Sequence, residues 1–155
     1  MSSGASEKTE HPEWKSYFET SGVAGTIVVT DLAKEETHVY NPQRAAEPFI
    51  PASTYKIPHS LIALETGVVK DENQSFKWDG QKRRVEAWDR DQTLRSALKY
   101  SVVWVYQEIA RQVGEPREAD YLKKFNYGNK DVSGGVDHFL RSCTSISYRS
   151  ASGAC

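Results

Sequence analysis

The sequence has little cysteine, no excess of basic charge and no long apolar run. Its two cysteines, Cys143 and Cys155, lie in the last thirteen of 155 residues, so they cannot form a disulfide framework or a metal site for the main body. A formal net charge of −1 argues against a basic nucleic-acid surface. Every apolar run is far shorter than the ~20 residues of a membrane-spanning helix. The expected partner is a small molecule or another protein.

Three composition zones divide the chain. Residues 1–13 are polar, and we expect them to be a disordered tail without the basic-then-apolar order of a secretory signal. Residues 14–140 carry the apolar periodicity of one domain with a real core. Residues 141–155 are rich in serine and show no periodicity, so we expect an unrelated tail.

Two short alternating runs predict a hairpin, with strands at residues 26–30 and 37–40. Helical spacing begins at Ser53 and ends at Gly67, and Pro58 is expected in the second turn, where it would remove one hydrogen bond. The charged and aromatic residues 71–91 predict a loop or weak strand.

Two further helices are predicted after that loop. Asp91 is a suitable N-cap for one continuous helix whose apolar face extends to Val113, with Gly114 as its end. Pro116 can open a third, shorter helix that reaches Phe125.

The segment "PASTYKIP" places Ser53 and Lys56 one helical turn apart among apolar neighbours. A serine hydroxyl is a weak nucleophile unless a nearby base takes its proton, and residues spaced i, i+3 share a helix face. Lys56 can be that base if an apolar pocket lowers its pKa and keeps the amine neutral. Unpaired N–H groups at the helix start favour negative charge on an acyl oxygen. The simpler alternative is that Ser53 only caps the helix.

A second Ser-x-x-Lys pair, Ser96 and Lys99, is an internal comparison. It stands beside Arg95 on a charged stretch, where a hydrated lysine keeps its proton. We therefore expect acyl-transfer chemistry at Ser53 and not at Ser96.

Three motifs in order, "PASTYKIP", "SVV" at residues 101–103 and "YGN" at residues 127–129, resemble the class D (oxacillinase-type) serine β-lactamases. The likeness extends from about Trp14 to Phe139. It implies an α+β fold of the β-lactamase/transpeptidase type, in which a helical region packs on an antiparallel sheet.

The resemblance also implies residue roles. Ser53 would be the acylated nucleophile, and Lys56 would carry a carbamate, formed from carbon dioxide, that acts as general base. Ser101 would shuttle a proton between Lys56 and the leaving nitrogen. Val103 would line the lysine pocket. The site rim would be shaped by Tyr127, Gly128 and Asn129.

The sequence departs from the family pattern near its end. Leu140 stands where the family usually has a tryptophan, and the later Lys-Thr-Gly strand and substrate-binding arginine are absent. We expect a chain truncated after about residue 140, lacking the C-terminal strands and closing helix and with doubtful activity.

The function implied is hydrolysis of penicillin-type β-lactams in the periplasm, with no metal and no cofactor other than the carbon dioxide on Lys56. None of the four histidines shows metal-ligand spacing. The alternatives are a penicillin-sensing receptor domain acylated without turnover, and an inactive fragment. A small β-lactam is the expected partner, nucleic acid and membrane are not, and a homodimer stays open.

Overall fold

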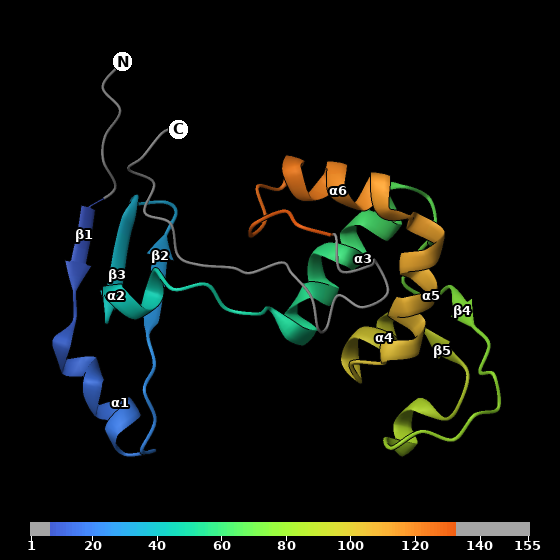
Figure 1. The fold of residues 1–155 in the computed structure, drawn as a ribbon, viewed down its shortest axis with the longest axis horizontal. Coiled ribbons are helices and arrows are strands. Elements are labelled where there is room, and N and C mark those ends of the chain that lie inside the picture. Colours follow the sequence, from blue (N-terminus) through green and yellow to red (C-terminus); the bar gives the residue numbers. More distant parts are fainter. Residues whose placement is uncertain (1–6, 133–155) are drawn as a thin grey trace. The chain divides into compact units, whose positions relative to one another are not determined.

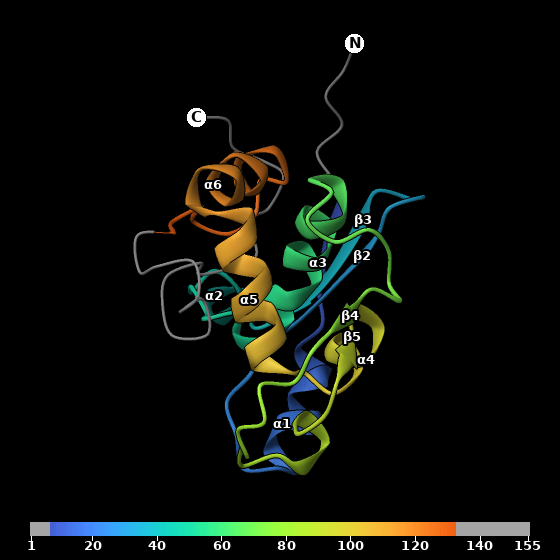
Figure 2. The ribbon, with the colours of Figure 1, turned by 90° about the vertical axis from the view of Figure 1, so that its right-hand side faces the viewer.

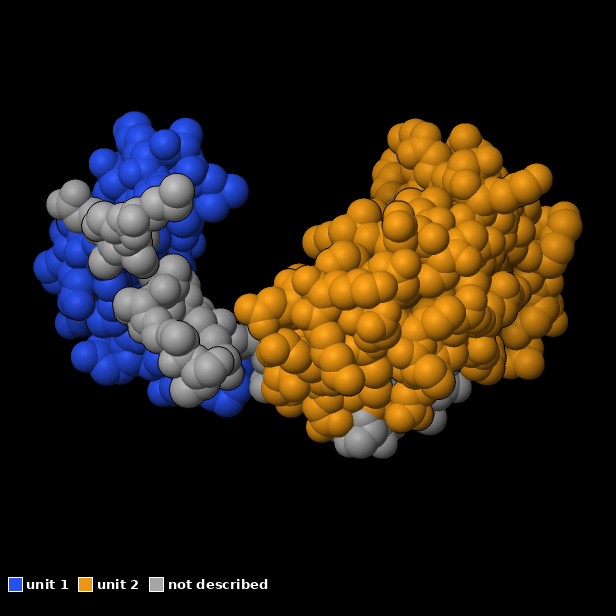
Figure 3. Space-filling view, turned by 90° about the horizontal axis from the view of Figure 1, so that it is seen from above, with its two compact units in different colours: residues 1–49, 147–155 blue, residues 50–146 orange. Residues whose placement is uncertain are grey.

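A computed structural model describes residues 7–132. These residues form two compact units, the first ending at Phe49 and the second beginning at Ile50 (Figure 3). The predictions made for Leu140 and for residues 141–155 lie outside the described residues.

The first unit contains a three-stranded sheet in the order β1-β3-β2 (Figure 1). Its strands are β1 (Glu7–Glu10), β2 (Ile27–Asp31) and β3 (Glu36–Tyr40). The antiparallel pair β2 and β3 is the hairpin that the sequence predicts, with Val28 opposite Val39. Val39 is fully buried, so the alternation of side chains along β3 places its apolar face inward.

Strand β1 pairs with β3 in parallel, so the prediction of a disordered tail is wrong for residues 7–13. The segment continues into the sheet edge, where the His11 N–H donates to the Val39 carbonyl at 2.8 Å. The His11 ring stacks on Trp14, with centroids 4.3 Å apart. The partner strand is remote in sequence, so the polar residues of β1 show no local pattern that predicts a strand. With this parallel pair the sheet is mixed and not purely antiparallel.

Short helical segments flank the sheet. They are η1 (Pro12–Trp14), α1 (Lys15–Glu19) and α2 (Pro42–Ala45). Gly25 lies against Phe18, and a Cβ at this glycine would stand 1.9 Å from the Phe18 Cε1 atom. Only glycine fits at position 25 while the Phe18 ring keeps this position.

The second unit is mainly helical (Figures 1 and 2). Its helices are η2 (Ala52–Tyr55), α3 (Lys56–Glu65), η3 (Glu86–Trp88), α4 (Leu94–Lys99), α5 (Val103–Val113) and α6 (Glu115–Lys124). Helix α5 packs against α3, α4 and α6. The two strands β4 (Ser75–Phe76) and β5 (Gln92–Thr93) form a small antiparallel pair. Segment 71–91 is therefore mostly loop, as predicted.

The helix predicted from Ser53 consists of two parts, because the 3-10 turn η2 precedes the α-helix α3. Pro58 is consequently the third residue of α3, where its missing N–H removes no intrahelical bond, so the predicted cost is wrong. Gly67 has a φ of +69° directly after the C-cap Thr66, which confirms it as the stop.

The single helix predicted from Asp91 to Val113 is wrong in two respects. It is broken between α4 and α5, where Ser101 adopts a left-handed φ of +54°. The N-cap is Thr93, which forms a capping box with Ser96. Asp91 instead accepts hydrogen bonds from the Trp78 N–H and from Lys77.

The buried core of the second unit draws on every one of its α-helices. Its members are Tyr55, Ile62, Ala63, Val69, Phe76, Leu94, Ala97, Val102, Trp104, Val105, Tyr106, Ile109, Ala110, Val113 and Leu122. A sheet in one stretch and helices in another confirm the α+β class. No helix in the described part is long and apolar enough to cross a bilayer.

Candidate active site

Three side chains predicted as catalytic meet at one point in the second unit. The Lys56 Nζ donates to the Ser53 Oγ at 3.1 Å, and the Ser101 Oγ donates to the same oxygen at 2.9 Å. Ser101 is 48 residues away from Ser53 in sequence, so the fold itself creates this contact. Two donors converge on one hydroxyl oxygen, an arrangement that stabilises negative charge developing there.

Lys56 is buried, with only 1% of its surface exposed. Burial lowers the pKa of Lys56 because the ammonium form loses its hydration. Among residues 7–132, no carboxylate forms an ion pair with it. The Tyr106 ring lies 5.5 Å from Nζ and can offer a cation in this desolvated position about 2 kcal/mol. Desolvation outweighs this attraction, so the pocket favours the neutral amine that the sequence analysis required.

Ser53 is exposed, and its hydroxyl does not cap a helix. Neither η2 nor α3 receives a side-chain cap, so the capping alternative is wrong. The serine therefore combines access from solvent with a buried amine behind it. This asymmetry suits a nucleophile whose substrate arrives from outside.

Ser101 reaches Ser53 from the break between α4 and α5. Its φ of +54° is unusual for a residue with a Cβ and costs about 1–2 kcal/mol. The turn is held by hydrogen bonds from the Ser101 N–H to Leu98 and from the Val102 N–H to Ala97. Strain of this kind is often retained where a side chain must point to a site.

The four residues predicted to line the site lie on two elements. Val103 is the half-buried first residue of α5. The Tyr127 ring packs against Tyr55 at 5.8 Å, and burial raises the pKa of its phenol. Gly128 has a φ of +53°, and the Asn129 side chain accepts from the Asp131 N–H within the same turn. Tyr127 thus contacts the nucleophile segment, while the roles of the other three stay predictions.

The comparison pair is arranged quite differently. The Ser96 hydroxyl donates to the Gln92 side chain and closes the capping box of α4. Lys99 is exposed, with its Nζ over the Tyr100 ring. A capping hydroxyl beside a hydrated amine is no activated nucleophile, in agreement with the sequence analysis.

Two neighbours of Lys56 were missed by the sequence analysis. Tyr106 on α5 forms the floor beneath the amine, and its hydroxyl lies 2.7 Å from the Ser60 Oγ. The Ser60 hydroxyl also contacts the Lys56 carbonyl at 2.7 Å. The spacing of Ser60, four residues after Lys56, is the local signal that could have identified it, whereas nothing in the local sequence distinguishes Tyr106 from other helix residues.

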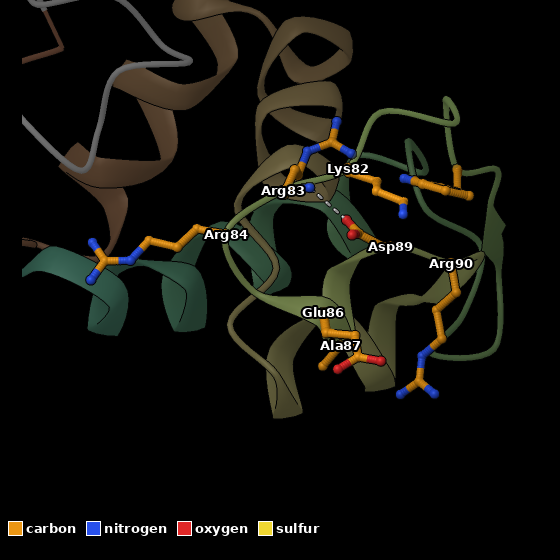
Figure 4. A pocket seen from close by; sticks show the side chains of 8 residues that line it. Lys82, Arg83, Arg84, Glu86, Ala87, Asp89 and Arg90 are labelled. Carbon is orange, nitrogen blue, oxygen red and sulfur yellow. Dashed lines mark hydrogen bonds between the residues drawn. The ribbon is translucent and has the colours of Figure 1, made fainter.

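A separate surface pocket of about 760 Å³ lies in the loop segment (Figure 4). Its wall is formed by Trp78, Lys82, Arg83, Arg84, Glu86, Ala87, Asp89 and Arg90. The Arg83 guanidinium binds Asp79, and the Arg83 N–H donates to Asp89 at 2.9 Å. The pocket is lined by charges of both signs, most of them exposed, which is typical of a hydrated surface.

The penicillin binding protein transpeptidase domain family matches residues 24–138, which include Ser53, Lys56 and Ser101. The chain belongs to this family.

Within this family, the similar proteins are class D β-lactamases. The chain is 50% identical over 139 residues to β-lactamase OXA-48 of Klebsiella pneumoniae, covering 90% of this chain and 52% of that protein. It is 47% identical over 131 residues to β-lactamase OXA-10 of Pseudomonas aeruginosa, covering 84% and 49%.

A solved class D β-lactamase from Sebaldella termitidis matches with a TM-score of 0.87 at 35% identity, over 93% of this chain and 58% of that chain. The structure of FUS-1 (OXA-85) from Fusobacterium nucleatum matches at 0.85 and 40% identity, over 90% and 58%. The α+β transpeptidase-like fold is therefore confirmed. The chain spans about half the length of the curated relatives it matches.

Proposed function

We propose that this chain opens the β-lactam ring of penicillin-type antibiotics through an acyl-enzyme on Ser53 and releases the product by hydrolysis. The observation that carries the proposal is the convergence of Lys56 Nζ and Ser101 Oγ on Ser53 Oγ. The similarity to β-lactamases, one of them 50% identical, supports a β-lactam as the substrate class.

Acylation requires a proton path as well as a nucleophile. The Ser53 Oγ attacks the lactam carbonyl carbon, and the new O–C bond forms as the hydroxyl proton passes to the Lys56 side. The ring C–N bond then breaks, and its nitrogen receives a proton through Ser101, which hydrogen-bonds the nucleophile. The proton released by Ser53 thus replaces the one delivered to the ring nitrogen, so the step balances.

Release of the product reverses the roles. The base on the Lys56 side chain takes a proton from a water molecule, and the water oxygen attacks the acyl carbon. The O–C bond to Ser53 then breaks, and the proton returns from that base to Ser53. The product is a carboxylic acid with an opened ring.

Lys56 fits uptake of carbon dioxide, because only a neutral amine adds it and burial favours the neutral form. A carbamate on this nitrogen supplies a general base in the pocket formed by Tyr106 and Ser60. Carbon-13 NMR in labelled bicarbonate tests this: we expect one carbamate signal that disappears in Lys56→Met and persists in Lys99→Met. Absence of the signal from the folded wild-type chain contradicts the modification.

The wall residues act on substrate position in this proposal. Val103 keeps water from the lysine, while Tyr127, Gly128 and Asn129 shape the rim around the nucleophile segment. The proposal includes a small-molecule β-lactam as substrate and, from the family resemblance, a periplasmic location. A homodimer stays a prediction.

A penicillin-sensing receptor domain is the second candidate, because the matched family is that of penicillin-binding transpeptidase domains. Such a domain uses the same acylation step and retains the adduct. The arrangement of Lys56 and Ser101 around Ser53 serves both functions, so the rate at which the acyl group is released from Ser53 separates them.

A chromogenic cephalosporin assay decides between the candidates. Sustained turnover that is lost in Ser53→Ala and retained in Lys99→Met supports the hydrolase. A single burst, equal to one adduct per chain, favours the receptor. No reaction from a chain that melts cooperatively contradicts both and leaves an inactive fragment.

A further inference from the structure

A second buried polar cluster lies directly behind the nucleophile segment. It consists of Tyr55 on η2, His59 on α3 and Glu118 on α6, all of them 2% exposed or less. The Tyr55 hydroxyl donates to the Glu118 Oε1 at 2.5 Å, and the His59 Nδ1 lies 2.8 Å from the same oxygen. The catalytic steps proposed above use none of these three groups.

Glu118 is the centre of this cluster. Its Oε1 accepts from the Tyr55 hydroxyl, and a proton on the Nδ1 of His59 allows that ring to donate to the same oxygen. Taking a carboxylate out of water is costly, and removal of a partner leaves donors unsatisfied. An apolar side chain at this position would leave the Tyr55 hydroxyl and the His59 Nδ1 without their shared partner.

Two members of the cluster flank Lys56 in sequence, and one of them follows Ser53 by two residues. Tyr55 lies between Ser53 and Lys56, and His59 lies one turn beyond Lys56 on the same helix. Both side chains bond to Glu118, more than 50 residues away, as the separations of 63 and 59 residues indicate. One carboxylate therefore fastens the helix junction between η2 and α3 to α6.

The cluster also borders the lysine pocket. The His59 ring lies 6.1 Å from the ring of Tyr106, and Tyr106 forms the floor beneath Lys56. On its other side, the Tyr55 ring contacts Tyr127 at 5.8 Å. A chain of neighbouring side chains thus links Glu118 to the surroundings of both Lys56 and the nucleophile.

We propose that Glu118 is a positioning residue, which through Tyr55 and His59 fixes the helix junction that holds Ser53 against the buried Lys56. Its importance for catalysis rests on the function proposed above. Positioning errors of about 1 Å can cost on the order of 10²-fold in rate, so a brace at this junction has a measurable effect.

The test compares Glu118→Met, which removes the acceptor at similar length, with Glu118→Gln, which retains one acceptor oxygen. Burst acylation of Ser53 by a chromogenic cephalosporin is measured in folded protein, as verified by a cooperative melt. We expect acylation to slow roughly 10- to 100-fold in Glu118→Met and to recover at least partly in Glu118→Gln. The matched control is Leu122→Ala, which removes a buried apolar side chain of the same helix and none of the cluster's hydrogen bonds. Equal slowing in Leu122→Ala, or no slowing in Glu118→Met, overturns the proposal.

A second readout does not depend on acylation. The ¹³Cε shift of Lys56 is followed against pH in lysine-labelled protein and assigned with Lys56→Met. If Glu118 holds the junction, Glu118→Met hydrates the amine and moves the Lys56 midpoint toward that of an ordinary lysine, whereas Leu122→Ala does not. An unchanged midpoint in Glu118→Met overturns the proposal. If the wild type is never acylated, the proposed function fails, while this shift still decides the positioning role.

Discussion

Lys56 and Ser53 lie one turn apart with their functional atoms 3.1 Å from each other, yet the lysine is buried and the serine is exposed. The amine is held where its charge is disfavoured, while the hydroxyl faces arriving molecules. This difference in environment, rather than the spacing alone, separates the pair from Ser96 and Lys99.

Replacing Lys56 by methionine is expected to stabilise the fold at neutral pH while strongly slowing acylation. The pKa of Lys56 is lowered in the folded state, so the unfolded chain binds a proton that the folded chain holds less tightly. The wild-type free energy of unfolding therefore rises with pH from the lowered pKa up to the ordinary value of about 10.4. The gain from Lys56→Met is largest below this window and disappears above it.

Denaturant titrations of Lys56→Met and Lys99→Met at several pH values, in buffer free of carbon dioxide, measure this difference. Acylation should fall on the order of 10²- to 10⁴-fold in Lys56→Met and stay unchanged in Lys99→Met. A pH-independent stability difference between Lys56→Met and the wild type is incompatible with a desolvated lysine.

The hydroxyl of Ser101 and its left-handed backbone conformation can be tested separately. Both Ser101→Gly and Ser101→Ala should slow acylation, on the order of 10²-fold, because each removes the donor to Ser53. Glycine tolerates the φ of +54° at this position, so Ser101→Gly should be about 0.5–1 kcal/mol more stable than Ser101→Ala after its larger entropy loss. Equal melting temperatures for the two variants would argue against the left-handed turn.

The core of the second unit should distinguish two neighbouring positions on α3. Ile62 is fully buried, whereas Leu61 is 54% exposed. Ile62→Ala is expected to cost about 2–5 kcal/mol of unfolding free energy, and Leu61→Ala no more than about 0.5 kcal/mol. Similar losses in urea unfolding would mean that α3 does not present this face to the core.

Gly25 and Phe18 should be coupled in the first unit. A Cβ at position 25 would overlap the Phe18 ring, so Gly25→Ala is expected to cost about 1–3 kcal/mol. Adding Phe18→Ala relieves the overlap, and the double variant should then lose less than the sum of the single losses. Strict additivity in a double-mutant cycle would place the two residues apart.

Local patterns predicted the parts of the fold that local physics determines. Alternation gave the hairpin of β2 and β3, and Gly67 marked the end of α3. The break at Ser101 was missed because the apolar spacing runs on through both α4 and α5. Strand β1 was missed because its pairing with β3 depends on residues almost thirty positions away.

The candidate site shows the same division. The spacing of Ser53 and Lys56 predicted their contact, and the family motif supplied Ser101, whose position follows only from the break between α4 and α5. Tyr106 and Glu118 could not be assigned to the site from sequence, since each reads as an ordinary helix residue until the packing of α5 and α6 on α3 is known.

Intact-mass analysis with peptide mapping, after brief exposure to a penicillin, tests the role of Ser53 as nucleophile most directly. We expect one added penicillin per chain, attached to the peptide that contains Ser53, and no addition in Ser53→Ala or Lys56→Met. A folded chain that stays unmodified, or carries its adduct on another residue, would contradict the assignment of Ser53 as the nucleophile activated by the buried Lys56.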